Sequence, residues 1–193
     1  MAKGKRVLMT EAEDFDEWDA KDMRPSGFGP MPLSEPWDML ILKRQPPEHW
    51  DQSVAVLYTM RSVRDFWGVL NNVRLSVGEN VHRHMFQTEG LGIFRHGLKP
   101  VWGSGGGMTQ SVWVKVGVDA KQFHWLLEEV GMALVGGMER LPGAFGVRVV
   151  DKSNKRSRFT RVEVWGDAEH PGFAGHAMRL LLRLCRQGGV VLH

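Results

Sequence analysis

Residues 112–135 read VWVKVGVDAKQFHWLLEEVGMALV, and within this stretch the spacing of apolar residues changes from that of a strand to that of a helix. In residues 112–118 valine dominates every second position while Trp113 and Lys115 fall on the other face, an alternation typical of a half-buried strand. Asp119 is a favourable N-cap for the helix that we predict to follow as far as residue 135. Its apolar stripe comprises Phe123, Leu126, Leu127, Val130 and Leu134.

Further elements are predicted on both sides of this stretch. Ser62 and Asp65 form a capping box that opens a helix through residue 73, and residues 171–187 form a last helix stopped by two glycines. The predicted strands cover residues 37–42, 53–58, 147–152, 159–165 and 190–192, the third and fourth being a hairpin around residues 153–158. The order of elements predicts an α+β fold, with one antiparallel sheet and helices covering one face of it.

The length and composition fit a single ordered domain. The chain has 193 residues, 42% of them hydrophobic, so we expect a domain at residues 31–193 with a substantial core. Residues 1–30 lack hydrophobic periodicity and are expected to form a flexible acidic tail, with seven acidic residues between Glu11 and Asp22. The single cysteine, Cys185, cannot form an internal disulfide, and no signal peptide or membrane span is evident. We therefore expect an intracellular protein without membrane contact, located in the cytoplasm, with the nucleus left open.

The second half of the domain is basic. Between Arg140 and His193 the sequence has ten Lys or Arg residues and four Asp or Glu residues. Such a balance favours an anionic partner such as RNA, although a solvated surface explains the charge alone equally well.

Tryptophan is unusually frequent, with eight residues against one tyrosine. We interpret Trp37, Trp113 and Trp165 as core residues because each lies in a predicted strand. Trp50 and Trp102 lie in predicted loops, the first after Pro46-Pro47 and the second before the glycine-rich residues 103–107. Two loop indoles that face each other would bind a flat, cationic ring between them.

Four stretches together resemble the eukaryotic translation initiation factor 4E family of mRNA cap-binding proteins. They are MPLSEPW at residues 31–37, SVRDFW at 62–67, IFRHGLKPVW at 93–102 and RVEVW at 161–165. The resemblance implies a curved antiparallel sheet backed by three helices, with a slot for the cap on the concave face. It also implies a binding protein and not an enzyme, with no cofactor and no metal.

The resemblance assigns roles on the cap side residue by residue. Trp50 and Trp102 correspond to the two indoles that stack on the methylated guanine, whose positive charge favours an aromatic sandwich. Trp165 corresponds to the residue that contacts the N7-methyl group. Lys152 and Arg161 correspond to the phosphate clamp, and strand alternation independently places Arg161 and Trp165 on one face. The alternative for Arg161 is a surface ion pair.

On the helical side, Trp67 corresponds to the tryptophan that docks partner helices carrying a Tyr-x-x-x-x-Leu motif. Pro32, Val63, Glu129 and Met132 correspond to its neighbours in that partner site. The alternative for Met132 is a place in the core. The implied partners are thus capped mRNA and a scaffold or 4E-binding protein.

The chain departs from the family pattern on the cap side. Gly103 stands where the family has a glutamate that accepts two hydrogen bonds from the guanine edge, and Val112 replaces a basic residue. Glu163, on the strand face of Arg161 and Trp165, is an alternative acceptor. The hairpin loop carries extra basic residues, Lys155, Arg156 and Arg158. These differences suggest a divergent member, and a more heavily modified cap as one ligand to test.

Three functions follow from these observations. The first is cap binding for translation initiation, with a helical scaffold partner. The second is a translational repressor or adaptor of the same fold, whose cap site is weak. The third is a basic RNA-binding α+β module without cap specificity. A metal site is a minor alternative, because His82 and His84 have a suitable spacing but no third ligand.

Overall fold

The computed structural model describes residues 31–43, 53–73, 88–101, 108–117, 120–136, 141–152 and 159–192. The seven strands of the described sheet lie in the order β2-β1-β3-β5-β6-β4-β7, and every neighbouring pair is antiparallel. The strands are β1 (Pro32–Lys43), β2 (Val54–Ser62), β3 (Thr88–Arg95), β4 (Thr109–Gly117), β5 (Ala144–Asp151), β6 (Thr160–Asp167) and β7 (Val191–Leu192). The described helices are α1 (Val63–Asn72), α3 (Ala120–Val135) and α4 (Phe173–Gln187).

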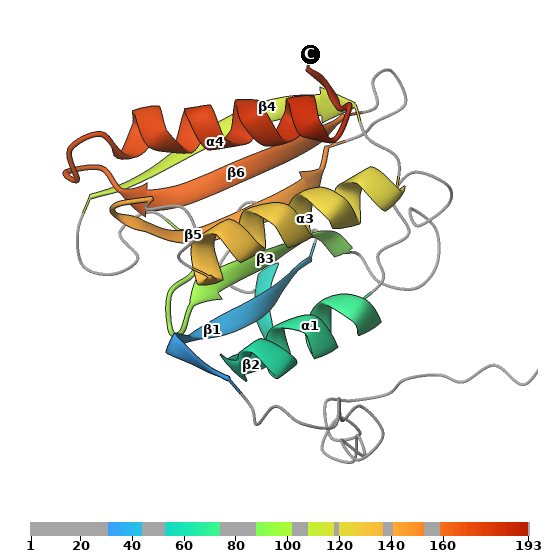
Figure 1. The fold of residues 1–193 in the computed structure, drawn as a ribbon, viewed down its shortest axis with the longest axis vertical. Coiled ribbons are helices and arrows are strands. Elements are labelled where there is room, and N and C mark those ends of the chain that lie inside the picture. The colour runs from blue at the N-terminus through green and yellow to red at the C-terminus, as the bar shows by residue number, and fades with distance from the viewer. Residues whose placement is uncertain are drawn as a thin grey trace, which may run out of the picture.

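All three described helices cover the same face of the curved sheet, as Figure 1 shows, so the predicted α+β fold is confirmed. The main core lies between the helices and this face. It includes Phe123, Leu126 and Leu127 of α3, which the sequence had placed on the apolar stripe, together with Leu181 of α4. None of the helices in the described ranges is long and apolar enough to cross a membrane.

The start of α1 is fixed by the capping box that the sequence predicts. The Ser62 hydroxyl accepts a hydrogen bond from the Asp65 amide at 3.2 Å, and the Asp65 carboxylate accepts one from the Ser62 amide at 2.9 Å. These bonds satisfy two amides that would otherwise lack partners at the helix N-terminus. The Val63 amide also donates to the Met31 carbonyl at 2.9 Å, so α1 begins beside the start of β1.

Alternation along the strands gives the sheet a second, smaller apolar cluster on the face away from the helices. In β6, Val162 and Val164 belong to the main core, whereas Trp165 belongs to this second cluster. Its other members are Leu40, Leu42, Val54, Phe94, Phe145 and Val150, with Leu98 packed against them. The helix-free face is therefore partly apolar, and the charged residues of β5 and β6 lie beside this apolar surface.

The strand β3 was not predicted from the sequence. Its sequence, TEGLGIFR, lacks a clear alternation because glycine occupies two of the central positions. A Cβ atom on Gly90 would lie 2.2 Å from the Val149 carbonyl oxygen, so this position requires glycine for the close approach of β5. The glycines that weaken the sequence signal are thus what allow the strand to pair.

Six of the sequence-based expectations fall outside the described residues. These are the acidic segment at residues 1–30, the stacking pair Trp50 and Trp102, the histidines His82 and His84, Gly103 in place of a glutamate, the N-cap Asp119, and the basic hairpin residues Lys155, Arg156 and Arg158. The boundary between a tail and a domain at residue 31 stays a prediction.

Candidate functional site

The described strand ends place the proposed phosphate-binding residues at the same end of the sheet as the strands that flank Trp50. Lys43, the last residue of β1, pairs with Thr88, and Gly90 two residues later pairs with Val150. Asp151 in turn pairs with Thr160, next to Arg161. The ends of the chain on either side of Trp50 therefore lie at the sheet end that carries Lys152 and Arg161.

A buried carboxylate organises the helix-free face of β5 and β6. Glu163 is 1% exposed, and Arg148 on the neighbouring strand binds it through two nitrogens, at 2.6 and 3.1 Å. The indole N–H of Trp165 donates to the same carboxylate at 2.9 Å. Arg161 forms an ion pair with it, its Nε lying 2.5 Å from Oε1 without the alignment of a hydrogen bond. One carboxylate thus holds the side chains of three neighbouring residues.

This cluster carries a net positive charge, because two guanidinium groups share one carboxylate. Arg148 is buried, whereas the side chain of Arg161 is 28% exposed. The Arg161 guanidinium lies 5.5 Å from the centre of the Trp113 ring, and Lys115 pairs in register with Arg161 on the adjacent strand. The arrangement presents cationic groups that can attract an anion such as phosphate.

The structure corrects the interpretation of Trp113 as a core residue, because its side chain is 49% exposed. It projects from the face of β4 opposite Val112 and Val114, which belong to the main core, and no described helix covers that face. Trp37 and Trp165 are both buried, as expected for core residues, at 2% exposure each. Trp165 is therefore in the second cluster, and the methyl contact assigned to it stays a prediction.

Lys152 lies at the base of the β5–β6 hairpin. Its amide donates to the Phe159 carbonyl at 3.0 Å, and its ammonium group pairs with Glu89 of β3. A role in phosphate binding would require Lys152 to share its charge between Glu89 and the ligand.

Arg148 was not predicted as a site residue, although the sequence contains a signal for it. Arg148 is the only charged residue inside the otherwise apolar run AFGVRVV, and it pairs in register with Glu163. A charge inside a buried strand requires a partner, and the facing strand supplied one. Since both Glu163 oxygens are occupied by protein groups, the structure gives this carboxylate an internal role and not that of an unoccupied acceptor for a ligand.

A second buried carboxylate fixes the turn that leads from β3 toward residue 102. Asp38 accepts hydrogen bonds from the Thr59 hydroxyl at 2.7 Å, from His96 at 3.0 Å and from the Gly97 amide at 3.0 Å. Burial alone would raise the pKa of Asp38, but these hydrogen bonds outweigh it and lower the pKa below its ordinary value of 3.8. Gly97 has a φ of 82°, a conformation that favours glycine.

The residues proposed for partner docking lie on the helical side. Pro32 is exposed, whereas Val63, Trp67, Glu129 and Met132 are half-buried. Trp67 packs edge-to-face on Phe66 at 5.3 Å between ring centres. Both Trp67 and Met132 are packed against the main core, so their surfaces are shared between the core and solvent.

Helices α1 and α3, which carry four of these five residues, approach each other at Phe66 and Gly131. A Cβ atom on Gly131 of α3 would lie 3.4 Å from the Phe66 ring and 2.7 Å from Ile93 Cδ1, so glycine allows this close contact. Figure 1 shows the two helices side by side over the sheet. Among the described residues, no group of three or more His, Cys, Asp or Glu side chains could hold a metal ion.

Curated relatives of the sequence all carry the same family name, although no protein-family model matches the chain. Eukaryotic translation initiation factor 4E-3 of Caenorhabditis elegans is 26% identical over 144 residues, which cover 67% of this chain and 53% of the relative. Factor 4E-1 of Phaseolus vulgaris is 26% identical over 171 residues, covering 82% and 66%. The chain thus spans about half to two thirds of the length of these relatives.

Solved structures of the same family share the fold. The complex of C. elegans eIF4E-3 with the 4E-binding protein Mextli and a cap analog has a TM-score of 0.60 at 21% identity, covering 86% of this chain and 92% of that one. The Ascaris suum eIF4E-3 complex with the m2,2,7G cap has a TM-score of 0.56 at 22% identity, covering 83% and 86%. The curved seven-stranded sheet with its helices is therefore the fold of these cap-binding proteins.

Proposed function

Because this chain is a divergent member of the eukaryotic translation initiation factor 4E family, we propose that it binds the 5′ cap of mRNA between Trp50 and Trp102. It acts as a binding protein and not as an enzyme, in keeping with relatives that are all named as initiation factors. The observation that carries the proposal furthest is the cationic cluster on the helix-free face. Arg161 lies there at the sheet end shared by the strands that flank Trp50.

The chemistry of the cap suits this arrangement. Methylation at N7 gives the guanine ring a positive charge, which the faces of two indoles attract. The triphosphate is an anion, and the Arg161 side chain is 28% exposed. Lys152 follows by two positions Val150, the residue that pairs with Arg161. Trp165 would contact the methyl group, its indole held by the hydrogen bond to Glu163.

We further propose that the helical face binds a scaffold or 4E-binding protein through a Tyr-x-x-x-x-Leu helix. Structures similar to this chain include C. elegans eIF4E-3 with Mextli and a schistosome eIF4E with a 4E-BP. Four of the proposed docking residues lie on α1 and α3, namely Val63, Trp67, Glu129 and Met132. Pro32 lies at the start of β1, and the preceding residue, Met31, accepts a hydrogen bond from the Val63 amide of α1. Through these two faces the chain would link capped mRNA to the translation machinery in the cytoplasm.

A second candidate function is a repressor or adaptor with a weak site for the simple cap. Gly103 favours it, because the chain lacks the family's glutamate at this position and Glu163 is occupied by Arg148 and Trp165. The same substitution also suits a trimethylated cap. Two methyl groups on the guanine N2 remove its N–H donors, so a carboxylate there would lose one of its two bonds and be crowded.

The slot is tested by retention of the full chain on immobilised 7-methylguanosine, with elution by free cap and not by GTP. Trp50→Ala and Trp102→Ala should each weaken binding by roughly 1–3 kcal/mol, because each removes one stacking face. Trp67→Ala removes an indole from the helical face and serves as the matched control. If both slot variants are retained like the parent while Trp67→Ala is also retained, the sandwich is wrong. Equal elution by cap and GTP would instead favour an RNA-binding module without cap specificity.

A further inference from the structure

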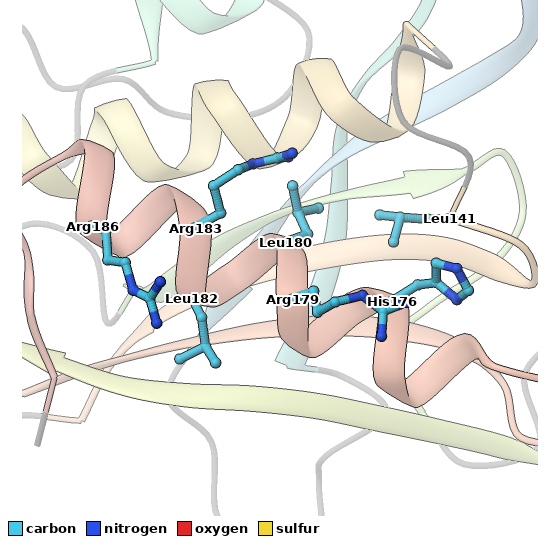
Figure 2. A pocket seen from close by; sticks show the side chains of 7 residues that line it. All are labelled: Leu141, His176, Arg179, Leu180, Leu182, Arg183 and Arg186. Atoms are coloured by element: carbon cyan, nitrogen blue, oxygen red, sulfur yellow. The ribbon is translucent and has the colours of Figure 1, made fainter.

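Helix α4 borders a cavity of about 400 Å³ that cap binding does not use. Its basic lining comes from His176, Arg179, Arg183 and Arg186, all exposed residues of α4. Its apolar lining comes from Leu141, Leu180 and Leu182. Figure 2 shows these side chains along α4, with Arg183 extending toward α3 and Leu141 approaching from the segment before β5. The cavity is in the size range of ligand pockets.

The four basic residues form one stripe of the helix. Their spacing of three, four and three residues keeps them on one side, since a turn has about 3.6 residues. The α4 sequence, FAGHAMRLLLRLCRQ, contains no Asp or Glu that could neutralise them. Neither Arg179 nor Arg186 forms an ion pair with any acidic side chain in the described ranges. Arg179 and Arg186 are therefore available to an acidic partner from elsewhere.

Because the pocket has both basic and apolar lining, a partner that fits it must supply both negative charge and apolar side chains. RNA would supply anionic charge but no aliphatic or aromatic side chains for the leucines. Residues 11–22 of this chain, EAEDFDEWDAKD, supply both, with seven carboxylates around Phe15 and Trp18. Aromatic residues three positions apart can insert into one groove if the segment forms a helical turn.

The connection to β1 is long enough for this contact. In the sheet order, β1 is three strands from β6, and α4 packs on β6 and β4. Strands about 4.8 Å apart give roughly 15 Å to β6 and roughly 19 Å to β4, whereas the eight residues between Asp22 and Met31 span up to about 26 Å when extended. A short tether of this kind also gives a high effective concentration.

We propose that residues 11–22 dock on the α4 pocket of the same molecule, with Phe15 and Trp18 against the half-buried Leu141 and Leu182 and the carboxylates against Arg179 and Arg186. The acidic segment then covers a basic surface that would otherwise attract nucleic acid nonspecifically. The interaction stands independently of cap binding, because it uses neither the slot nor the Trp67 face.

The experiment places a spin label on the acidic segment of the full chain and measures amide signals by NMR. Ala20→Cys provides the site, since the native thiol of Cys185 is 1% exposed and resists labelling. Amide signals of α4 should lose at least half of their intensity while those of β2, at the far edge of the sheet, keep theirs. Arg179→Glu with Arg186→Glu should abolish this difference, and adding Asp16→Lys with Glu17→Lys should restore it.

The matched control is Arg64→Glu with Lys121→Glu, which makes the same charge change at exposed residues outside the pocket. It should leave the α4 effect intact, and dispersed spectra establish that each variant is folded. Uniform signal loss, or an α4 effect that survives reversal of both arginines, would overturn the proposal. So would an effect seen only between labelled and unlabelled copies, which indicates a contact between molecules. Shifts of α4 signals by an uncapped oligonucleotide without any effect of the label would assign the pocket to RNA.

Discussion

Glu163 is the residue on which the charged face of the sheet depends. A carboxylate buried in this way is tolerated only because Arg148, Arg161 and the Trp165 indole surround it. The same contacts orient two groups that the proposed cap site needs, one for the phosphates and one for the methyl group. In the proposed cap site, Glu163 and Arg148 would thus position other side chains without contacting the ligand themselves.

Replacing this carboxylate tests the network. Glu163→Gln keeps the shape but leaves Arg148 buried without its counter-charge, so we expect the free energy of unfolding to fall by about 3 kcal/mol. Urea unfolding followed by far-UV circular dichroism measures the change. Glu169→Gln, at an exposed residue near the end of β6, is the control and should unfold like the parent. A Glu163→Gln midpoint equal to that of the control would show that the network contributes little to stability.

Gly103 leads to a prediction about cap type. Gly103→Glu supplies an acceptor for the guanine edge and should tighten binding of the 7-methylguanosine cap by about 1–2 kcal/mol, less than a full charge-assisted pair because the surroundings are not built for it. It should not tighten binding of the m2,2,7G cap, whose N2 carries methyl groups in place of hydrogens. Fluorescence titration of parent and variant with both caps gives the four affinities. Weaker binding of the simple cap by the variant would mean that another acceptor already occupies the position.

At the scale of the elements, a helix or strand could be predicted where the interactions that define it are made by residues close together in the sequence. The capping box of α1 could be predicted because Ser62 and Asp65, three residues apart, each accept a hydrogen bond from the other's backbone amide. The strand β3 could not be predicted, because its Gly90 is needed for close packing against β5, a segment far away in the sequence. Trp113 was wrongly assigned to the core because the covering of a strand face also depends on segments far away in the sequence. Alternation separates the two faces of a strand but does not tell which face the helices will cover.

The candidate site was predictable in part for the same reason. Arg161 and Trp165 share a face because they belong to one strand, so alternation sufficed. The involvement of Arg148 depends on the register between β5 and β6, which the sequence alone does not define. The stacking of Trp50 against Trp102 rests on the family resemblance and stays a prediction.

The buried Asp38 links β1, β2 and the turn after β3, and it predicts a dependence of stability on pH. Its folded-state pKa is lowered, so ionised Asp38 stabilises the fold above the ordinary value of 3.8, and this contribution is lost as the pH falls through the lowered pKa. Asp38→Asn should reduce the free energy of unfolding by about 1–3 kcal/mol at pH 7 and by less at pH 3. Urea unfolding at both pH values tests this.

A graded control is available at the same carboxylate. Thr59→Val removes one of the donors to Asp38 and should cause a smaller loss than Asp38→Asn. An Asp38→Asn loss that is the same at pH 3 and pH 7 would mean that the hydrogen-bond geometry, and not the charge, is what matters.

At the scale of the whole molecule, one sheet separates two surfaces of different chemistry. The helical side presents α1 and α3 with Trp67 half-exposed, and the other side presents Arg161 and Trp113. Val162 and Val164 of β6 face the main core between them, so the side chains of the two surfaces have no shared contacts there. Distant sites without shared partners respond independently to substitution.

The last prediction is therefore that each surface can be inactivated without the other. Trp67→Ala should weaken a Tyr-x-x-x-x-Leu peptide by 2 kcal/mol or more, about thirtyfold, as expected for a central aromatic anchor, and should change cap affinity less than twofold. Arg161→Ala should leave the peptide affinity unchanged. It should weaken a triphosphate cap more than the methylated nucleoside and reduce the salt dependence of binding, because one phosphate contact is lost. Isothermal titration of both variants with peptide, nucleoside and triphosphate gives all the affinities at two salt concentrations. Since Trp67 also packs on the core, a thermal melt accompanies each titration. Loss of peptide and cap binding together in a Trp67→Ala protein that melts like the parent would show that the two faces are coupled through the sheet, contrary to this account.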